Sequence, residues 1–319
     1  MAPKKSMSEG PRRKMLKSKA QMDETLSTDN TFRSSKDSVR FHDDIAHRTV
    51  VFGKIIDFPY LANYHIHLKE LFEAQGWENF LSKRQLQYTT LVKHFYTHFE
   101  FKHDIITSYV KGKFITLPLA TLASILGVPR TNVKRYTTNS WMQFEGYNPL
   151  ESIRQMCENP SIEEAYKPKI SDLTLESRLI HHIIAHNIFP RNGSYEYCTY
   201  LDLFFIWCIL NKVKLDLALY IGWHMDTCVK KKNGALPYGL HITTILNHSG
   251  INLSGEKETR KAIQTDVYGE KTMKQMKFEL KDGTWVKNDV HVVEEMDEAD
   301  AHGNEEAMQE GSRASNRTF

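Results

Sequence analysis

The sequence predicts a mainly α-helical, multi-helix globular domain that carries one small β-hairpin and is flanked by two disordered tails. Apolar residues recur at helical spacing between short turn signals over most of the chain, which is typical of helices packed around a core. A hydrophobic content of 40% in 319 residues allows a sizeable core of this kind. The two ends lack this periodicity and differ in charge, so the domain is expected over residues 41–255.

Charge is segregated between the two ends of the chain. Residues 1–40 hold ten Lys and Arg against five Asp and Glu, which predicts a disordered basic tail. Residues 256–319 hold ten basic residues against fifteen acidic ones, and the stretch 289–310 has nine acidic residues with no Lys or Arg. A largely disordered acidic tail is therefore expected over 256–319. The middle is nearly balanced, so the sequence pI of 8.5 does not indicate nucleic-acid binding by the folded part.

The first helices are predicted from the residues that begin and end them. Apolar residues between 58 and 74 indicate one amphipathic helix, with Pro59 in its first turn and Gly76 just past its end. The next helix is predicted to begin at Ser82, because Gln85 stands at the capping-box spacing from it.

A change of period then predicts the hairpin and the remaining helices. Residues 104–117 carry β-branched and aromatic runs on either side of Lys111-Gly112, as expected for a short hairpin. Pro118 begins a helix that Gly127 ends. Residues 130–148 are irregular. Further helices are expected over 149–157, 174–189, 199–211 and 215–230, followed by a shorter one that ends at Ser249-Gly250.

Several blocks, in order, resemble a known family. The stretches GWENFL (76–81), VKGKFITLPLATLASILGVP (110–129), NIFPRNGSYEYCTYLDLFFIWCIL (187–210) and LPYGLHITTILNHSGINLSGE (236–256) look like the putative plant transposon protein domain of plant retroelements. The resemblance spans roughly residues 50–256. A shorter likeness, to the plant mobile domain, rests on FITL…ILGVP alone. Neither resemblance supplies catalytic residues, so what it implies is a retroelement origin and no reaction.

No motif commits the chain to catalysis or to a cofactor. The sequence contains no GxxxxGK[ST], GxGxxG or GxSxG, and HIIAH at 182–186 lacks the glutamate of HExxH. We therefore predict no catalytic residue, no cofactor, no metal and no small-molecule substrate. One metal hypothesis stays open, in which the i, i+4 pairs His182 with His186 and His224 with Cys228 assemble a four-ligand zinc site. A transposase would need three acids converging on two metal ions, and Asp202 is better explained as a helix-start residue.

Cysteine usage and hydropathy predict the compartment. The four cysteines form no CxxC and no apolar signal sequence is present, so free thiols in a reducing compartment are expected. The most apolar run, 203–210, is too short to span a bilayer, so no membrane partner is predicted. Five basic residues near the N-terminus resemble a nuclear import signal: Lys4, Lys5, Arg12, Arg13 and Lys14. Nuclear localisation is the expectation, with the cytoplasm as the alternative.

The sequence thus favours a non-catalytic interaction or assembly module from a plant retroelement, acting through a protein partner or self-association. The alternative is a non-specific nucleic-acid-binding protein that uses its basic N-terminal tail. In that case a loop with four candidate contacts would add phosphate interactions: Arg130, Lys134, Arg135 and Tyr136. A metal-dependent transposase is the third and most distant hypothesis.

Deleting residues 1–40 tests the alternative. If the basic tail supplies non-specific affinity, the deletion lowers the affinity for labelled single-stranded and duplex nucleic acid and flattens its dependence on salt, because fewer counterions are released. Binding titrations at low and moderate salt measure both effects. Equal affinity and equal salt slope in the two chains would contradict a role for the tail.

Overall fold

The computed structural model describes residues 31–133, 139–191 and 195–288, and these fold as two compact units. Unit 1 holds the described parts of Met1–Phe52, Leu86–Arg130 and Leu217–Lys261, and unit 2 holds the described parts of Gly53–Gln85, Thr131–Asp216 and Ala262–Phe319. Each unit is therefore built from three separate stretches of chain. The two units interleave in sequence, and the domain bounds of 41–255 expected from the sequence stay a prediction.

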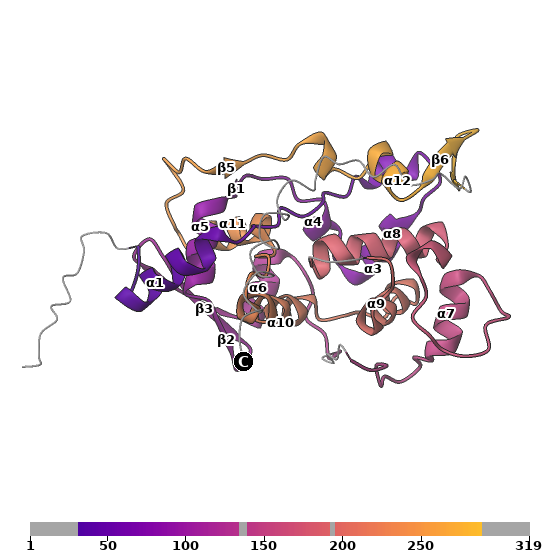
Figure 1. Cartoon of the computed structure of the whole chain (residues 1–319), viewed down its shortest axis with the longest axis horizontal. Coiled ribbons are helices and arrows are strands. Elements are labelled where there is room, and N and C mark those ends of the chain that lie inside the picture. The colour runs from indigo at the N-terminus through magenta and orange to yellow at the C-terminus, as the bar shows by residue number, and fades with distance from the viewer. Residues whose placement is uncertain (1–30, 134–138, 192–194, 289–319) are drawn as a thin grey trace, which may run out of the picture. The chain divides into compact units, whose positions relative to one another are not determined.

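Unit 1 combines helices with a small antiparallel sheet (Figure 1). Its elements are α1 (Ser35–Asp43), η1 (Ile45–His47), β1 (Gln87–Tyr88), α5 (Thr89–Thr97), β2 (Glu100–Lys102), β3 (Ile105–Val110), β4 (Lys113–Pro118), α6 (Leu119–Leu126), α10 (Leu217–Lys230), α11 (Gly239–His248) and β5 (Thr259–Arg260). The mainly helical class is confirmed, with more strands than the sequence indicated.

The predicted hairpin is present in unit 1. Strands β3 and β4 pair in antiparallel register from Ile105↔Pro118 to Val110↔Lys113, and the turn lies at Lys111-Gly112. A third strand, β2, pairs with β3 and was not predicted from the sequence. Helix α6 follows at once and ends at Gly127, whose φ of 68° is the left-handed conformation that glycine adopts without strain.

The capping box predicted at Ser82 is wrong. Ser82 ends the short helix α4 (Glu78–Leu81) of unit 2, and its hydroxyl donates to the carbonyl of Glu78. The helix that carries Leu91 and Phe95 is α5, which begins only at Thr89 after strand β1. Because β1 pairs with β5, about 170 residues later in the chain, a local capping rule could not foresee this start.

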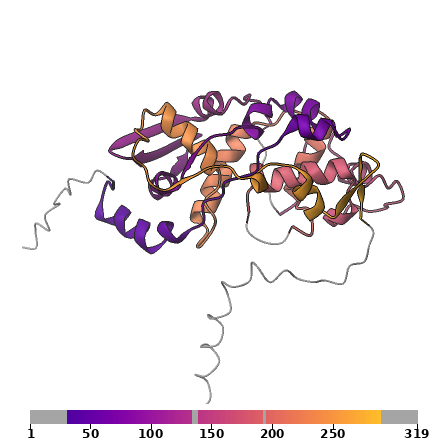
Figure 2. The same ribbon diagram turned by 90° about the horizontal axis from the view of Figure 1, so that it is seen from above.

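Unit 2 holds the remaining elements. They are α2 (Phe58–Ala62), α3 (Leu68–Gln75), α4, α7 (Pro149–Cys157), η2 (Ile170–Asp172), α8 (Leu175–Ile183), η3 (Ile184–Ile188), α9 (Tyr200–Leu210), η4 (Gln264–Asp266), α12 (Glu270–Gln275), β6 (Phe278–Lys281) and β7 (Thr284–Lys287). Strands β6 and β7 form a separate hairpin at the yellow end of the ribbon (Figure 2).

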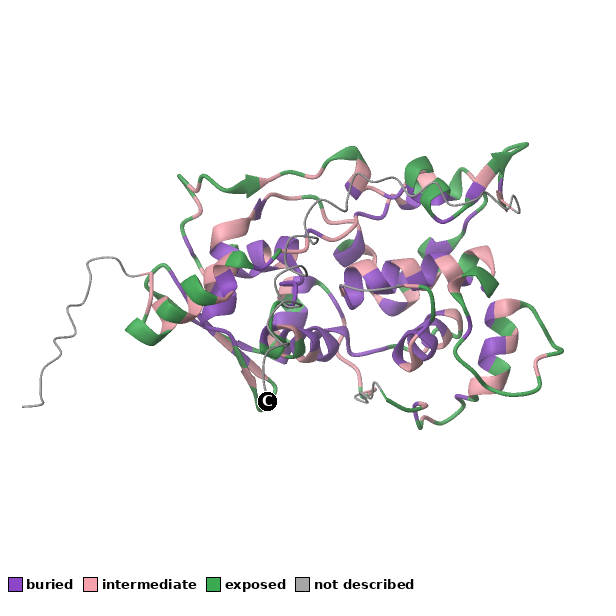
Figure 3. Cartoon of the chain, viewed as in Figure 1, coloured by how far each residue is buried: buried purple, intermediate pink, exposed green. Residues whose placement is uncertain are grey.

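Helix α9 is the core of unit 2. Eight of its eleven residues are buried, and Figure 3 shows it in the colour of buried residues over most of its length. Helices α3, α7 and α8 all contact it. The aromatic residues Phe144 and Tyr147 of the irregular segment pack edge-on against Phe204 of α9. A helix that is apolar all round is explained by this enclosure on several sides.

Two predicted helices are interrupted. The helix expected over 58–74 divides into α2 and α3, with His65 between them at a φ of 60°. The helix expected over 174–189 begins as predicted, with Thr174 as its N-cap, but its last turn widens into the π-helical segment η3. Such wide turns are frequent at functional sites, and η3 carries His186 into the cavity described below.

The predicted tails are corrected where the structure describes them. Residues 256–288 form β5, η4, α12, β6 and β7, and they bury Tyr268 and Trp285 almost completely. Helix α1 likewise begins at Ser35, inside the segment expected to be disordered. Aromatic residues that follow no helical or strand period pack these segments against the core. Residues 1–30 and 289–319 lie outside the described residues.

Within the described parts of the chain, we find no helix both long and apolar enough to cross a membrane.

Gln75 joins α3 to the chain that leaves α9. Its side-chain amide donates to the carbonyls of Cys208 and Val213, at 3.2 and 2.7 Å, and its side-chain oxygen accepts from the backbone N–H of Leu215 at 3.1 Å. Gln75 has no exposed surface. One buried glutamine therefore satisfies three backbone groups where α9 ends.

We expect Gln75→Leu to lower the free energy of unfolding by about 3 kcal/mol, because buried backbone groups without partners each cost roughly 1–3 kcal/mol. Chemical denaturation followed by tryptophan fluorescence measures the change. Gln155→Leu on the exposed face of α7 is the matched control and is expected to stay within about 0.5 kcal/mol of the parent chain. Equal effects of the two substitutions would contradict the assigned role.

Candidate functional site

A capping box positions the start of α9. The Thr199 hydroxyl accepts from the backbone N–H of Asp202, and the Asp202 carboxylate accepts from the backbone N–H of Thr199, at 3.1 and 2.9 Å. The prediction that Asp202 serves a helix start is confirmed. Acidic side chains are favoured there by the helix dipole as well as by these hydrogen bonds.

Asp202 also forms a buried ion-pair cluster. Arg191 donates two hydrogen bonds to its carboxylate at 3.0 and 2.8 Å, and the His181 ring nitrogen lies 3.5 Å from one carboxylate oxygen. Asp202 has no exposed surface. Burial alone would raise the pKa of this carboxyl, but His181 and Arg191 outweigh burial and hold the pKa well below its usual range. The cluster joins α8, α9 and the chain that follows η3.

The same cluster orients an aromatic side chain. The Arg191 guanidinium lies over the Tyr195 ring, 5.4 Å from its centroid, and the Tyr195 hydroxyl donates to the backbone carbonyl of Arg191. Tyr195 in turn stacks on the His186 ring with centroids 5.2 Å apart. The position of Tyr195 at the cavity wall thus follows from the Asp202–Arg191 pair.

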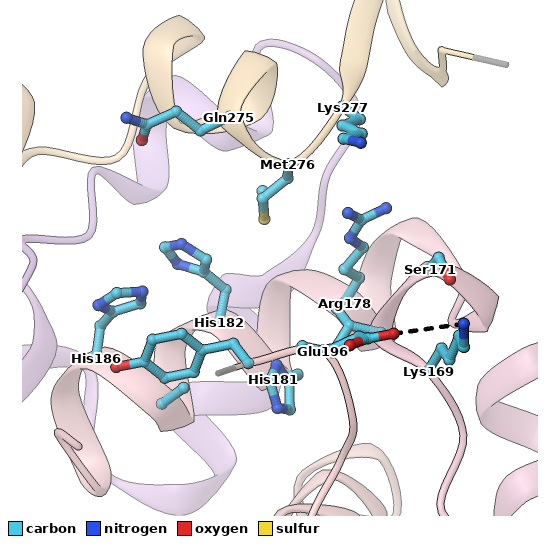
Figure 4. Close-up of a pocket in the computed structure, with 13 residues that line it drawn as sticks. Lys169, Ser171, Arg178, His181, His182, His186, Glu196, Gln275, Met276 and Lys277 are labelled. Carbon is cyan, nitrogen blue, oxygen red and sulfur yellow. Dashed lines mark ion pairs between the residues drawn. The ribbon is translucent and has the colours of Figure 1, made fainter. Parts of the chain in front are cut away.

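A cavity of about 390 Å³ opens beside this cluster, entirely within unit 2 (Figure 4). The elements η2, α8 and η3 form one side, and the end of α12 forms the other. Its lining residues are Lys169, Ile170, Ser171, Arg178, His181, His182, Ala185, His186, Tyr195, Glu196, Gln275, Met276 and Lys277. This volume suits a few side chains of a peptide or a small ligand.

Two histidines and a tyrosine form an aromatic wall of the cavity. The rings of His182 and His186, one helical turn apart, have centroids separated by 4.1 Å. His182 Nδ1 shares a hydrogen bond with the hydroxyl of the buried Tyr268, and His186 stacks on Tyr195. Figure 4 shows the two imidazoles side by side below Met276.

The two histidines of this wall, His182 and His186, are called the histidine wall below, and they are uncharged at neutral pH. Burial, followed by the neighbouring His186 ring and the Lys54 ammonium, lowers the pKa of His182 from 6.5 to about 2. Burial and Lys54 lower the pKa of His186 to about 4. Both rings are therefore neutral near pH 7, where they offer aromatic surface and one exchangeable N–H each.

The other end of the cavity is cationic. Lys169, Arg178 and Lys277 line it, and among the described residues they face a single carboxylate, Glu196, which lies 3.4 Å from the Lys169 ammonium (the dashed line in Figure 4). The Arg178 guanidinium lies over the Phe278 ring at 5.1 Å. Burial lowers the pKa of Arg178, and its Nε atom is buried without a hydrogen-bond partner among the residues that the structure describes. A half-buried guanidinium in this state favours an anionic ligand.

The cysteine thiols are held in the protonated form. Burial raises the pKa of Cys157 and of Cys228 to about 11, and raises those of Cys198 and Cys208 further. Since the thiolate is the nucleophile, these groups are unsuited to nucleophilic chemistry at neutral pH. Cys198 and Cys208 are buried, which is typical of cysteines that serve packing.

The residues of the zinc hypothesis form two separate pairs. His182 and His186 belong to unit 2, whereas His224 and Cys228 belong to unit 1, where the histidine Nε2 and the sulfur lie 3.4 Å apart. Among the described residues of either unit, no group of three or more His, Cys, Asp or Glu side chains lies close enough together to hold a metal ion. The same finding covers the carboxylate triad considered for a transposase.

Most residues of the two basic segments singled out from the sequence fall outside the described residues. These are Lys4, Lys5, Arg12, Arg13 and Lys14 of the import signal, and Lys134, Arg135 and Tyr136 of the loop. Arg130 is described and closes the second stretch of unit 1. The roles predicted for these residues stay predictions.

The cavity was not predicted from the sequence. His182 and His186 were noted for their spacing, but as metal ligands, and Arg178, Lys169 and Lys277 were not noted at all. About 100 residues separate Arg178 from Lys277, and no local pattern links them. The one available signal was the apolar and aromatic content of 268–285, which indicates a folded segment there.

Comparison with protein families matches residues 73–252 to the model of the putative plant retrotransposon-related domain. The match covers over half of the chain and agrees with the resemblance found in the sequence. Neither the curated proteins nor the solved structures contain a significant match. The matched segment includes the histidine wall, Arg178 and Asp202, whereas Met276 and Lys277 lie beyond it.

We expect stability to fall as the pH is lowered from about 6.5 to about 4. In this window the unfolded chain protonates His182 and His186 while the folded chain keeps them neutral, so lowering the pH favours unfolding. Each histidine contributes a slope of up to about 1.4 kcal/mol per pH unit. Asp202 does not interfere, because its depressed pKa affects stability only at lower pH.

Urea unfolding at pH 7, 6 and 5 measures this slope. His186→Gln is expected to reduce it, whereas the exposed His67→Gln leaves it unchanged. A slope that is the same in all three chains would show that the cavity histidines titrate normally in the folded state.

Proposed function

Because this chain belongs to the putative plant retrotransposon-related domain family, we propose that it serves a plant retroelement as a non-catalytic interaction module. Its binding site is the cavity of unit 2, and its partner is an acidic segment of a protein. The observation that carries the proposal is the cavity's charge: three cations face one carboxylate, and Arg178 has a buried donor atom without a partner among the described residues.

Charge and shape together favour a carboxylate-bearing peptide. Lys169, Arg178 and Lys277 supply donors for carboxylates, and the guanidinium can bind one in a bidentate manner. Met276, Ile170 and the neutral histidine wall offer apolar and aromatic surface to the rest of the segment. An acidic segment that also carries apolar residues would satisfy both parts of the site.

The ionisable groups around the cavity support binding over catalysis. His182 and His186 have pKa values far below 7, which makes them poor bases at neutral pH. The carboxylate of Asp202 is already occupied by Arg191, His181 and Thr199. These contacts are typical of a structural ion-pair cluster. A carboxylate that already accepts them is poorly placed to take a proton from a ligand.

Nucleic-acid binding is the competing proposal. Phosphates would satisfy the same cations, and the basic residues of the first forty positions would add affinity. A protein segment is favoured because a cavity of about 390 Å³ accommodates a few side chains and its lining is partly apolar and aromatic. Nuclear localisation, carried by the basic stretch near the N-terminus, is proposed with either partner.

Binding of a fluorescein-labelled hexaglutamate peptide to the full chain tests the proposed function. Fluorescence anisotropy is measured at low salt, in parallel on a chain in which Glu294, Glu295, Asp297 and Glu298 are replaced by their amides, so that its own acids cannot compete. We expect saturable binding by at least one of the two chains, and no binding of hexalysine. Labelled single-stranded DNA is the competing probe.

The substitution Arg178→Gln tests whether hexaglutamate binds at the cavity. The substitution is expected to weaken hexaglutamate binding by at least about five-fold, because an ion pair with the half-buried guanidinium is worth at least as much as the strongest exposed pairs. Arg154→Gln, on α7 and away from the cavity, is the matched control and leaves binding unchanged. No binding by either chain, equal effects of the two arginine substitutions, or binding of DNA alone would refute the proposal.

A further inference from the structure

The described chain ends at the rim of the cavity. Strand β7 returns the chain beside β6, and the backbone N–H of Asn288 donates to the carbonyl of Lys277 at 2.8 Å. The Lys287 ammonium donates to the carbonyl of Ser171 at 2.8 Å. Lys277 and Ser171 both line the cavity, so two contacts hold the last described residues against it.

The sequence that continues from this point is complementary in charge. Nine acidic residues and no Lys or Arg occur between 289 and 310, and the first dense cluster is Glu294, Glu295, Asp297 and Glu298. Among the described residues, the cavity presents the cations of Lys169, Arg178 and Lys277 and one carboxylate, that of Glu196. Val292, Val293 and Met296 stand among these acids, and they match the apolar part of the lining.

The connection is long enough for the cluster to enter the cavity of its own chain. Six residues lead from Asn288 to Glu294, and an extended chain spans about 3.3–3.6 Å per residue, or roughly 20 Å. Since the backbone of Asn288 is hydrogen-bonded to Lys277 at the cavity rim, the chain needs to cover a much shorter distance to reach the cavity. Tethering also raises the local concentration of a short segment to the millimolar range, which favours its own cavity over that of a second copy.

We propose that the acidic segment 292–298 of this chain occupies the unit 2 cavity and acts as a built-in competitor of the external acidic partner. In this arrangement carboxylates of the segment pair with Arg178, Lys277 and Lys169. The inference rests on the proposed function, because it assigns the same site an internal ligand. An external partner must then displace this segment, so the chain is regulated by its own tail.

Zero-length carbodiimide crosslinking of the full chain tests this inference, because it joins only carboxylates and amines that are in contact. We expect mass spectrometry to identify crosslinks from Lys277 and Lys169 to Glu294–Glu298. The crosslink between Lys111 and Glu256, 2.7 Å apart in unit 1, verifies the chemistry. Lys281, exposed at the turn end of the β6–β7 hairpin, is the comparison lysine for chance encounters.

Three changes establish that the contact is specific. Arg178→Gln, which removes no amine, is expected to lower the yield of the Lys277 crosslinks by up to about five-fold, whereas Arg154→Gln leaves it unchanged. At 1 M salt the yield falls, because charges are then screened within about 3 Å. In a mixture of ¹⁵N-labelled and unlabelled chains, crosslinks within one isotopic species indicate a chain that binds its own segment.

The outcomes separate this inference from the proposed function. Crosslinks to Lys281 as abundant as those to Lys277, no effect of Arg178→Gln, or crosslinks mainly between isotopic species would overturn it. If, in addition, hexaglutamate binds the parent chain and the amide-substituted chain equally, the cavity is an acidic-peptide site without an internal ligand. If the segment does compete, the amide-substituted chain binds hexaglutamate more tightly than the parent.

Discussion

The buried carboxylate of Asp202 is the constraint on which the candidate site depends. It has no contact with solvent, yet it keeps its charge because Arg191 and His181 surround it and the start of α9 donates to it. Removing one partner of such a buried pair typically costs about 3–5 kcal/mol. The pair also sets the course of the chain after η3, and so the position of Tyr195 beside His186.

Two electrostatic environments lie side by side in the cavity. The histidine wall is neutral because burial and Lys54 oppose its protonation, whereas Arg178 keeps its charge while half-buried against Phe278. The cationic character of the site therefore comes from arginine and lysine and does not depend on pH near neutrality. A cavity with this lining would distinguish ligands by their fixed negative charge, as the proposed binding of an acidic segment requires.

The structure departs from the sequence-based expectations where distant segments meet. The start of α5 is set by the pairing of β1 with β5, and the break after α2 occurs at His65, where no breaking residue stands. Residues 256–288 have little periodicity, but they bury Tyr268 and Trp285 in unit 2. Local propensity is a weak guide in such places, because tertiary contacts decide whether a short segment is ordered.

From the sequence alone one can predict the mainly helical class, the hairpin at Lys111-Gly112, the helix end at Gly127, the cap of Asp202 on α9 and the family of the chain. All of these depend on residues within a few positions of one another, or on ordered blocks of sequence. That Arg178 and Lys277 share a cavity could be learned from the three-dimensional structure alone. Packing brings together groups about 100 residues apart, and no spacing rule reaches that far.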